Sequence, residues 1–132
     1  MDWQKFETEI HKLTSKISKK PDIVIPIVRG GLIPGRLLAK YLGIKDMYAL
    51  TIKKLDSERK ITSAINEVLD GKNILLVEDV LETGTSMMAA KDYLIAKGAI
   101  VQTAALYFLP ETKIKPDYYI SEKPTVPTFP WD

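Results

Sequence analysis

The 132-residue chain contains no cysteine and only one histidine. Without cysteine it can form neither disulfides nor thiolate metal sites, and it is compatible with a reducing cytosol. The one histidine, His11, lies off the apolar face of the first predicted helix, and a catalytic histidine needs an orienting partner. We therefore interpret it as a surface residue, and we look for chemistry among the acids, hydroxyls and cations.

Long apolar runs and a strong net charge are also absent. No apolar run approaches the roughly 20 residues of a membrane-spanning helix, and the amphipathic start, MDWQKFETEI, has no apolar signal core. A net charge of +2 gives no electrostatic reason to expect nucleic-acid binding. With 45% hydrophobic and 27% charged residues, the chain is typical of one globular domain over 1–132, and we expect it to be cytoplasmic.

The spacing of apolar residues predicts alternating helices and strands. Helices are predicted over 3–17, from 32 to a cap at Gly43, over 61–70 and over 87–97, and buried strands over 22–28, 47–52, 74–77 and 100–108. Such alternation favours an α/β fold with a parallel sheet, whose ligands bind at the carboxyl ends of the strands. The prolines after Leu109 indicate an irregular cap with one short strand near 118–120.

The stretch 73–86, NILLVEDVLETGTS, is the most informative part of the chain. Its apolar start runs into Glu78 and Asp79, and a third acid, Glu82, precedes a Thr/Gly/Ser turn and a predicted helix. Hydroxyls and free backbone N–H groups at a helix start favour phosphate, and the acids can meet ribose hydroxyls or Mg²⁺. Acidic strand ends also occur in domains that bind no nucleotide, but this ordered run is more specific than an acidic pair.

Two other segments are candidates for binding anions. Arg29-Gly30-Gly31 follows the first strand, where the guanidinium suits phosphate and the glycines permit close approach. The alternative is a plain turn with a solvated arginine. The polar run 53–61, KKLDSERKI, is either a solvated loop or a mobile lid that brings its cations, Lys53, Lys54, Arg59 and Lys60, to a polyphosphate. Together these features suit a sugar phosphate with a second anionic group and bridging Mg²⁺.

These motifs resemble those of type I phosphoribosyltransferases. ILLVEDVLETGTS resembles their phosphoribosyl pyrophosphate signature, and VRGG resembles their pyrophosphate loop. The resemblance implies the type I phosphoribosyltransferase fold, a central parallel sheet flanked by helices, with a core over about 20–108 and a small C-terminal hood over 109–132. It also implies Mg²⁺-dependent transfer of phosphoribosyl from 5-phosphoribosyl 1-pyrophosphate to a base, and a homodimer or higher homo-oligomer.

The resemblance assigns the phosphoribosyl site residue by residue. Glu78 and Asp79 would contact the ribose 2′- and 3′-hydroxyls, and Mg²⁺ would meet these acids only indirectly, through substrate and water. The 5′-phosphate would be held by Thr83, Gly84, Thr85 and Ser86. Pyrophosphate would be bound by the turn of Arg29, Gly30 and Gly31, with a cis peptide before Arg29. Two cations of the lid, Arg59 and Lys60, would also bind it.

The resemblance also indicates the base. Members that act on 6-oxopurines share an acid at the place of Glu82, where it is the candidate general base, so we expect guanine, xanthine or hypoxanthine as substrate. The terminal Pro-Trp-Asp resembles the xanthine-guanine branch, but that branch has Lys-Pro where this chain has Leu109-Pro110, and its stacking aromatic falls near Val126. The residues expected at the purine are Val80, Lys113, Lys115, Val126 and Pro127.

Three other classes of protein share some of these features. The departures at Leu109 and Val126 leave open a non-catalytic regulator of the same fold that senses phosphoribosyl pyrophosphate or nucleotides. Glu82, Arg29 and the lack of a basic binding face argue against it. A phosphoacceptor receiver domain would need its acidic pair near the N-terminus, and a phosphoribosyl pyrophosphate synthetase would need about two domains.

Overall fold

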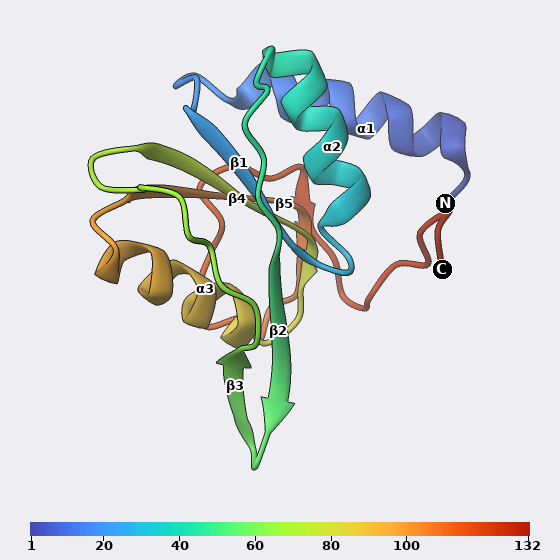
Figure 1. Ribbon diagram of the computed structural model, residues 1–132. Helices are drawn as coiled ribbons and strands as arrows, with labels where there is room; N and C mark the ends of the chain where they lie inside the picture. The colour runs from blue at the N-terminus through green and yellow to red at the C-terminus, as the bar shows by residue number, and fades with distance from the viewer.

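The central sheet has six strands in the order β3-β2-β1-β4-β5-β6, as seen in a computed structural model that describes residues 1–132 (Figure 1). The strands are β1 (Ile23–Val28), β2 (Leu50–Leu55), β3 (Glu58–Ile61), β4 (Asn73–Leu81), β5 (Ile100–Phe108) and β6 (Ser121–Glu122). Only β2 and β3 pair antiparallel. The helices are α1 (Trp3–Lys16), α2 (Leu32–Leu42) and α3 (Thr85–Ala96). This arrangement confirms the predicted α/β fold, a central and mainly parallel sheet flanked by helices.

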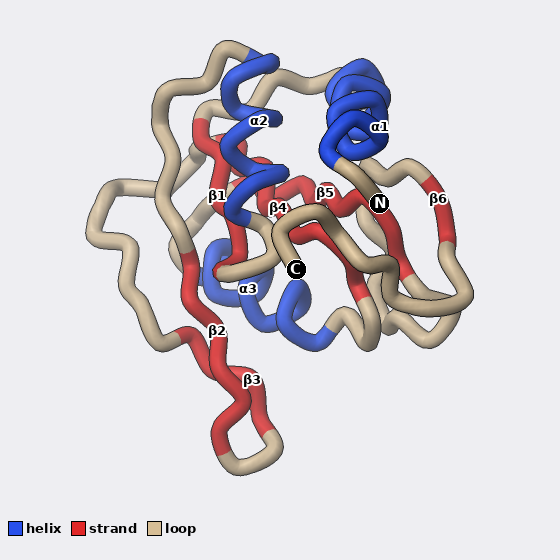
Figure 2. The backbone as a smooth tube through the Cα atoms, turned by 90° about the vertical axis from the view of Figure 1, so that its right-hand side faces the viewer, coloured by secondary structure: helices blue, strands red, loops and turns tan.

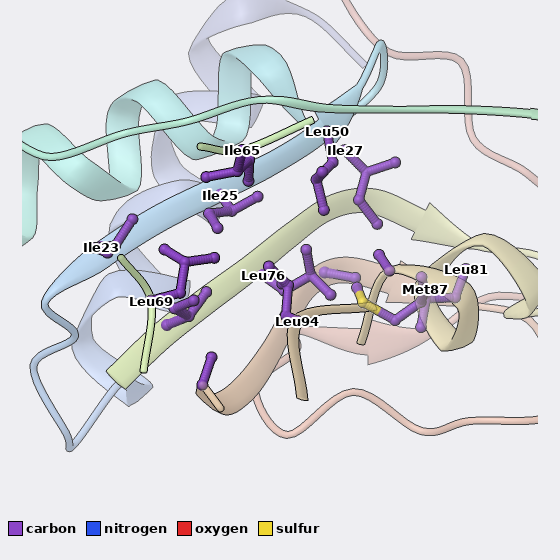
Figure 3. Packing of buried hydrophobic residues seen from close by; sticks show 14 of the residues in the cluster. Ile23, Ile25, Ile27, Leu50, Ile65, Leu69, Leu76, Leu81, Met87 and Leu94 are labelled. Carbon is purple, nitrogen blue, oxygen red and sulfur yellow. The ribbon is translucent and has the colours of Figure 1, made fainter. Parts of the chain in front are cut away.

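Each face of the sheet buries its own hydrophobic cluster, because side chains alternate along a strand. Ile23, Ile25 and Ile27 of β1 point toward α3, where they pack with Leu76 and Leu94, as Figure 3 shows. On the other face, side chains from α1, α2 and the sheet form the second cluster. Figure 2 shows α1 and α2 on one side of the sheet and α3 on the other. No helix is both long enough and apolar enough to cross a bilayer.

Strand β4 is longer than the sequence predicts. The predicted strand ends at Val77, whereas β4 continues to Leu81 because β5 stays paired with it as far as Leu81↔Phe108. Pairing with β1 stops at Pro26↔Val77. Glu78 and Asp79 therefore lie within the strand, on a portion that β1 leaves open on one side.

The prediction of a loop over 53–61 is wrong, because this segment forms a β-hairpin. Strands β2 and β3 pair from Ile52↔Ile61 to Leu55↔Glu58. The two turn residues, Asp56 and Ser57, have φ angles of 48° and 68°, the left-handed turn that suits the twist of a two-residue hairpin. The predicted strand 47–52 is correspondingly displaced to 50–55, and Met47 makes only a bridge to Val24.

The helix predicted over 61–70 is wrong as well. The chain there continues along β2, where Thr62 N donates to the Thr51 carbonyl oxygen (2.8 Å) and Ser63 Oγ accepts from Thr51 N (2.8 Å). Ile65 and Leu69 are each buried, while Val68 is 78% exposed. The four-residue apolar spacing thus reflects two separate core contacts of an irregular chain.

The remaining boundaries agree closely with expectation. Gly43 caps α2 with a φ of 74°, and β5 spans the predicted residues 100–108. Helix α3 begins at Thr85, two residues before the predicted start, because the turn at Gly84 (φ 79°) already leads into the helix. The strand expected near 118–120 is instead the bridge of Tyr118 to Ala104 followed by β6.

The C-terminal tail returns to the N-terminal helix, so the two termini lie side by side (Figure 1). The Met1 amino group donates to the Thr128 carbonyl oxygen at 3.0 Å. The Trp131 ring stacks on Phe129 and meets Phe6 edge-on, each with centroids 4.9 Å apart. This aromatic contact fixes the end of the tail against α1.

Candidate functional site

Two adjoining cavities lie at the carboxyl ends of β1 and β4, where the sequence predicts ligand binding. The first is lined by Arg29, Gly30, Glu78, Asp79, Trp131 and Asp132. The second is lined by Arg59, Glu78 and the backbone and side chains of residues 80–86. Glu78 belongs to both cavities. The strand ends and the start of α3 thus bring together the three segments that the sequence singled out.

The phosphate loop, residues 82–86, forms the sharp turn from β4 into α3. Thr83 and Thr85 have their hydroxyl oxygens 3.0 Å apart at the start of the helix, which begins without a side-chain cap. A helix start leaves several N–H groups without backbone partners, and they favour an anion. The start of the C-terminal tail contacts this loop, because Lys113 N donates to the Thr83 carbonyl oxygen at 2.9 Å. The geometry of the loop is suited to an anion.

The turn after β1 lies directly against the acidic pair. The Val28–Arg29 peptide is cis, in agreement with the resemblance. A Cβ at position 30 would fall 2.5 Å from Asp79 Oδ1, so only glycine allows this approach. Asp79 Oδ1 also accepts from Val80 N at 2.7 Å. The turn that carries Arg29 is thereby held beside the carboxylates of β4.

Burial of these carboxyls changes their protonation. Burial, with the neighbouring Asp79, raises the pKa of Glu78 to about 8, while the Arg59 guanidinium opposes this rise. The pKa of Asp79 is also raised, chiefly by burial, against hydrogen bonding from Val80 N and the Trp131 side chain. The surroundings of both carboxyls thus favour the protonated form.

The comparison with protein families decides the identity of this fold. The chain matches the phosphoribosyl transferase domain over residues 1–132. The chain belongs to this family. The parallel sheet, the phosphate loop and the acidic pair at the strand ends are therefore the parts of a phosphoribosyl transferase domain.

Solved structures share the whole fold. A purine phosphoribosyltransferase from Pyrococcus horikoshii is 30% identical, with a TM-score of 0.94, and the match covers 100% of this chain and 92% of that one. A hypothetical protein from Neisseria gonorrhoeae with bound ppGpp is 27% identical (TM-score 0.85), with 100% and 87% covered. The fold is also shared by the xanthine-guanine-hypoxanthine phosphoribosyltransferase of Helicobacter pylori, which is 21% identical (TM-score 0.87). That match covers 98% of this chain and 90% of the other.

The two hairpin cations expected at pyrophosphate lie apart in this phosphoribosyl transferase domain. Arg59 reaches the phosphate loop, where its Nε donates to Thr85 Oγ1 at 3.3 Å. Lys60 points to Glu58 of its own strand, 3.7 Å away. Neither lines the cavity that contains Arg29 and Gly30.

The five residues expected at the purine do not line one cavity. Val80 lines the cavity of the phosphate loop, and Lys113 lines a larger one between the hairpin and α3. The Lys115 ammonium lies over the Tyr119 ring, 5.0 Å from its centroid. Val126 is 44% exposed, and neither it nor Pro127 lines a cavity. The role of these residues at the base stays a prediction.

Sequence reasoning placed Trp131 and Asp132 in a tail that covers the core or forms the wall of an apolar pocket, but it did not list them as site residues. Both line the cavity of the acidic pair, although they are some fifty positions away in the chain. Their only sequence signal is the terminal Pro-Trp-Asp, which points to a branch of the family without assigning a role. The long return of the tail brings them there.

Proposed function

We propose that this protein transfers phosphoribosyl from 5-phosphoribosyl 1-pyrophosphate to a 6-oxopurine, giving a nucleoside 5′-monophosphate and pyrophosphate in purine salvage. The observation that carries the proposal is the meeting of the phosphate loop, the acidic pair and the Arg29-Gly30 turn at one edge of the sheet. The Pyrococcus relative, a purine phosphoribosyltransferase aligned over all of this chain, supports the purine.

Each segment has a part in the proposed reaction. The phosphate loop anchors the 5′-phosphate, and Glu78 and Asp79 hold the ribose hydroxyls, so that C1 faces the Arg29 turn. The bond to pyrophosphate breaks through an oxocarbenium-like transition state, and Arg29 stabilises the charge that develops on the leaving group. Glu82, exposed at the start of the phosphate loop, takes or orients the purine proton.

The acids available here fit a Mg²⁺ ion that is held mostly by substrate. No group of three or more Asp, Glu, His or Cys side chains is placed to hold a metal ion. Mg²⁺ prefers six oxygens and often keeps several waters, with one or two carboxylates and substrate phosphates completing its shell. Glu78 and Asp79 would meet such an ion indirectly, through the substrate hydroxyls and water. The ion, when bound, would neutralise charge on the pyrophosphate.

A second candidate function is a nucleotide-sensing regulator. The Neisseria relative, with ppGpp bound, is 27% identical to this chain and aligns with all of it. Leu109, where the xanthine-guanine branch has lysine, is buried, with 4% of its surface exposed, so it offers a base no polar group. This candidate predicts nucleotide binding without turnover.

A steady-state assay of pyrophosphate release separates the two functions. Hypoxanthine, guanine, xanthine and adenine are each supplied with the phosphoribosyl donor, and we expect turnover with at least one of the first three. Glu82→Gln should lower kcat by about 100-fold or more, as for loss of a general base, and leave the donor Kd within about twofold. Donor binding without turnover on any purine would establish the regulator instead, and use of adenine alone would refute the 6-oxopurine assignment.

A further inference from the structure

A cavity at the C-terminal end of α2, here called the α2 cavity, has no part in the site described above. It measures about 460 Å³ and is lined by Arg36, Ala39, Lys40, Gly43, Ile44, Lys45 and Met47. Met47 bridges Val24 near the start of β1, whereas the Arg29 turn follows the end of that strand. Figure 1 shows this end of α2 pointing away from the hairpin. The eleven residues of α2, about 16 Å of helix, therefore separate the α2 cavity from the proposed catalytic site.

The charged residues that line the α2 cavity are all cations. Arg36 and Lys40 lie one turn apart on the same face of α2, and Lys45 joins them from the loop that follows. The Lys20 ammonium is also close, 3.8 Å from the place that a Cβ of Gly43 would take. None of these four cations forms an ion pair, and no acid lines the cavity.

The end of the helix does not by itself account for these cations. Like charges four residues apart destabilise a helix, so Arg36 and Lys40 gain nothing from each other. A helix C-terminus favours cations within its last turn, which includes Lys40 but not Arg36. The carbonyl oxygens of Ala39 and Lys40 already accept from Ile44 N (2.8 Å) and Gly43 N (3.2 Å). The cations of the α2 cavity therefore lack a negatively charged partner within the fold.

We propose that the α2 cavity is a second anion site, which binds a ligand with two or more linked phosphates. Several cations around one cavity suit an oligophosphate, and the guanidinium of Arg36 supplies a donor fork for one of its phosphates. Ile44 and Met47 add an apolar wall, against which the sugar or base of a nucleotide can pack, and the volume is that of a small-molecule site. The ligand is therefore a free oligophosphate or a nucleoside di- or triphosphate. This inference does not rest on the proposed function.

Amide chemical shifts of ¹⁵N-labelled protein separate the α2 cavity from the proposed catalytic site. Gly43 and Lys45 report on the cavity, and Gly30 and Gly84 report on the catalytic site. During titration with inorganic tripolyphosphate, Gly43 and Lys45 should shift saturably with a Kd below about 1 mM, whether or not the other two amides shift. The absence of a saturable shift at Gly43 and Lys45 up to about 10 mM would overturn the inference.

Two double variants test whether the cations of the cavity hold the anion. Arg36→Gln with Lys40→Gln changes two exposed side chains, and we expect the Kd at Gly43 to rise about 10-fold or more, as for loss of charge-assisted hydrogen bonds. Lys72→Gln with Lys97→Gln is the matched variant, because it removes the same charge from exposed lysines that line no cavity. It should raise that Kd less than about threefold. Equal losses in the two double variants would overturn the inference in favour of general attraction of anions.

ATP and adenosine identify the source of the phosphates. ATP that binds at Gly43 at least about tenfold more tightly than tripolyphosphate would support a nucleotide ligand, whose apolar part packs on Ile44 and Met47. Equal affinity of the two compounds would support a free oligophosphate. Adenosine that binds there as tightly as ATP would overturn the inference, because the phosphates would then contribute nothing.

Discussion

Glu78 has the carboxyl group whose charge is most strongly opposed by its surroundings. It sits half-buried in β4 between Asp79 and the phosphate loop, and burial together with Asp79 raises its pKa to about 8. Ligand hydroxyls can accept a hydrogen bond from the protonated acid or donate to the carboxylate. The folded protein therefore favours the neutral form of a carboxyl group that is charged at neutral pH in the unfolded chain.

A consequence of this raised pKa is that the empty protein loses stability as pH rises. Between the ordinary glutamate pKa and about 8, the folded state holds a proton that the unfolded state has released, so the free energy of unfolding falls with pH. Glu78→Gln abolishes this contribution. Its stability advantage over the unaltered protein should therefore grow from pH 5 to pH 8, by at most about 1.4 kcal/mol per pH unit, and level off above pH 8.

Urea unfolding followed by circular dichroism at pH 5, 6.5 and 8 measures this difference. Glu58→Gln is the control, because it removes a carboxyl from the exposed hairpin, where nothing buries the charge. A Glu78→Gln advantage that stays constant over these pH values would show that Glu78 is already ionised in the folded protein.

Gly84 is the hinge between β4 and α3, and it determines the shape of the phosphate loop. Its φ of 79° is left-handed, and a Cβ there would lie 2.5 Å from Thr112 Oγ1 and 2.8 Å from Ile114 Cγ2. Gly71 has a similar φ, 71°, but a Cβ there would meet nothing within 4 Å. The two glycines share the backbone conformation and differ only in steric contact.

Gly84→Ala should lower the free energy of unfolding by about 2 to 4 kcal/mol, and Gly71→Ala by about 1 to 2 kcal/mol. The loss in Gly84→Ala includes both backbone strain and the collision of the new methyl group with the tail, whereas the loss in Gly71→Ala includes backbone strain alone. Urea unfolding of both variants measures the difference. Gly84→Ala should also weaken ribose 5-phosphate binding, because the loop must shift away from the tail. Equal stability losses in the two variants would mean that the tail yields freely and does not shape the loop.

The elements that sequence could predict are those whose signals are contiguous. Strand β5 and the cap at Gly43 follow from local patterns, and the phosphate loop is recognisable because its residues are adjacent in the chain. The hairpin was not predictable in this way, since residues 53–60 are exposed and show no apolar pattern, and the strands are joined by a tight turn at Asp56 and Ser57. The helix predicted over 61–70 was wrong because Ile65 and Leu69, which contact the core separately, happen to have the spacing of a helix.

Distance along the chain limited the prediction of the site in the same way. Glu78, Asp79 and residues 83–86 form one run, so their shared function could be read from it. Trp131 and Asp132 join the site only through long-range packing, by the return of the tail. No local pattern contains that information.

At the scale of the whole molecule, the site depends on contact between the two ends of the chain. Phe129 is buried, with 3% of its surface exposed, and its ring stacks on Trp131 with an interplanar angle of 3°. Trp131 contacts Phe6 of α1 on one side and lines the cavity of the acidic pair on another. The packing of α1 thus positions a wall of the cavity that no residue of α1 reaches.

Phe129→Ala tests this coupling. Loss of the buried ring should lower the free energy of unfolding by about 3 to 5 kcal/mol, and it should also weaken ribose 5-phosphate binding several-fold, because Trp131 loses the ring that orients it. Trp3→Ala is the comparison: Trp3 meets Trp131 at a centroid distance of 6.1 Å but is 55% exposed, so both losses should be smaller. Urea unfolding and isothermal titration of folded protein supply the two measurements. Reduced stability with unaltered binding in Phe129→Ala would mean that the aromatic contact only closes the fold and that the acidic pair needs no wall from the tail.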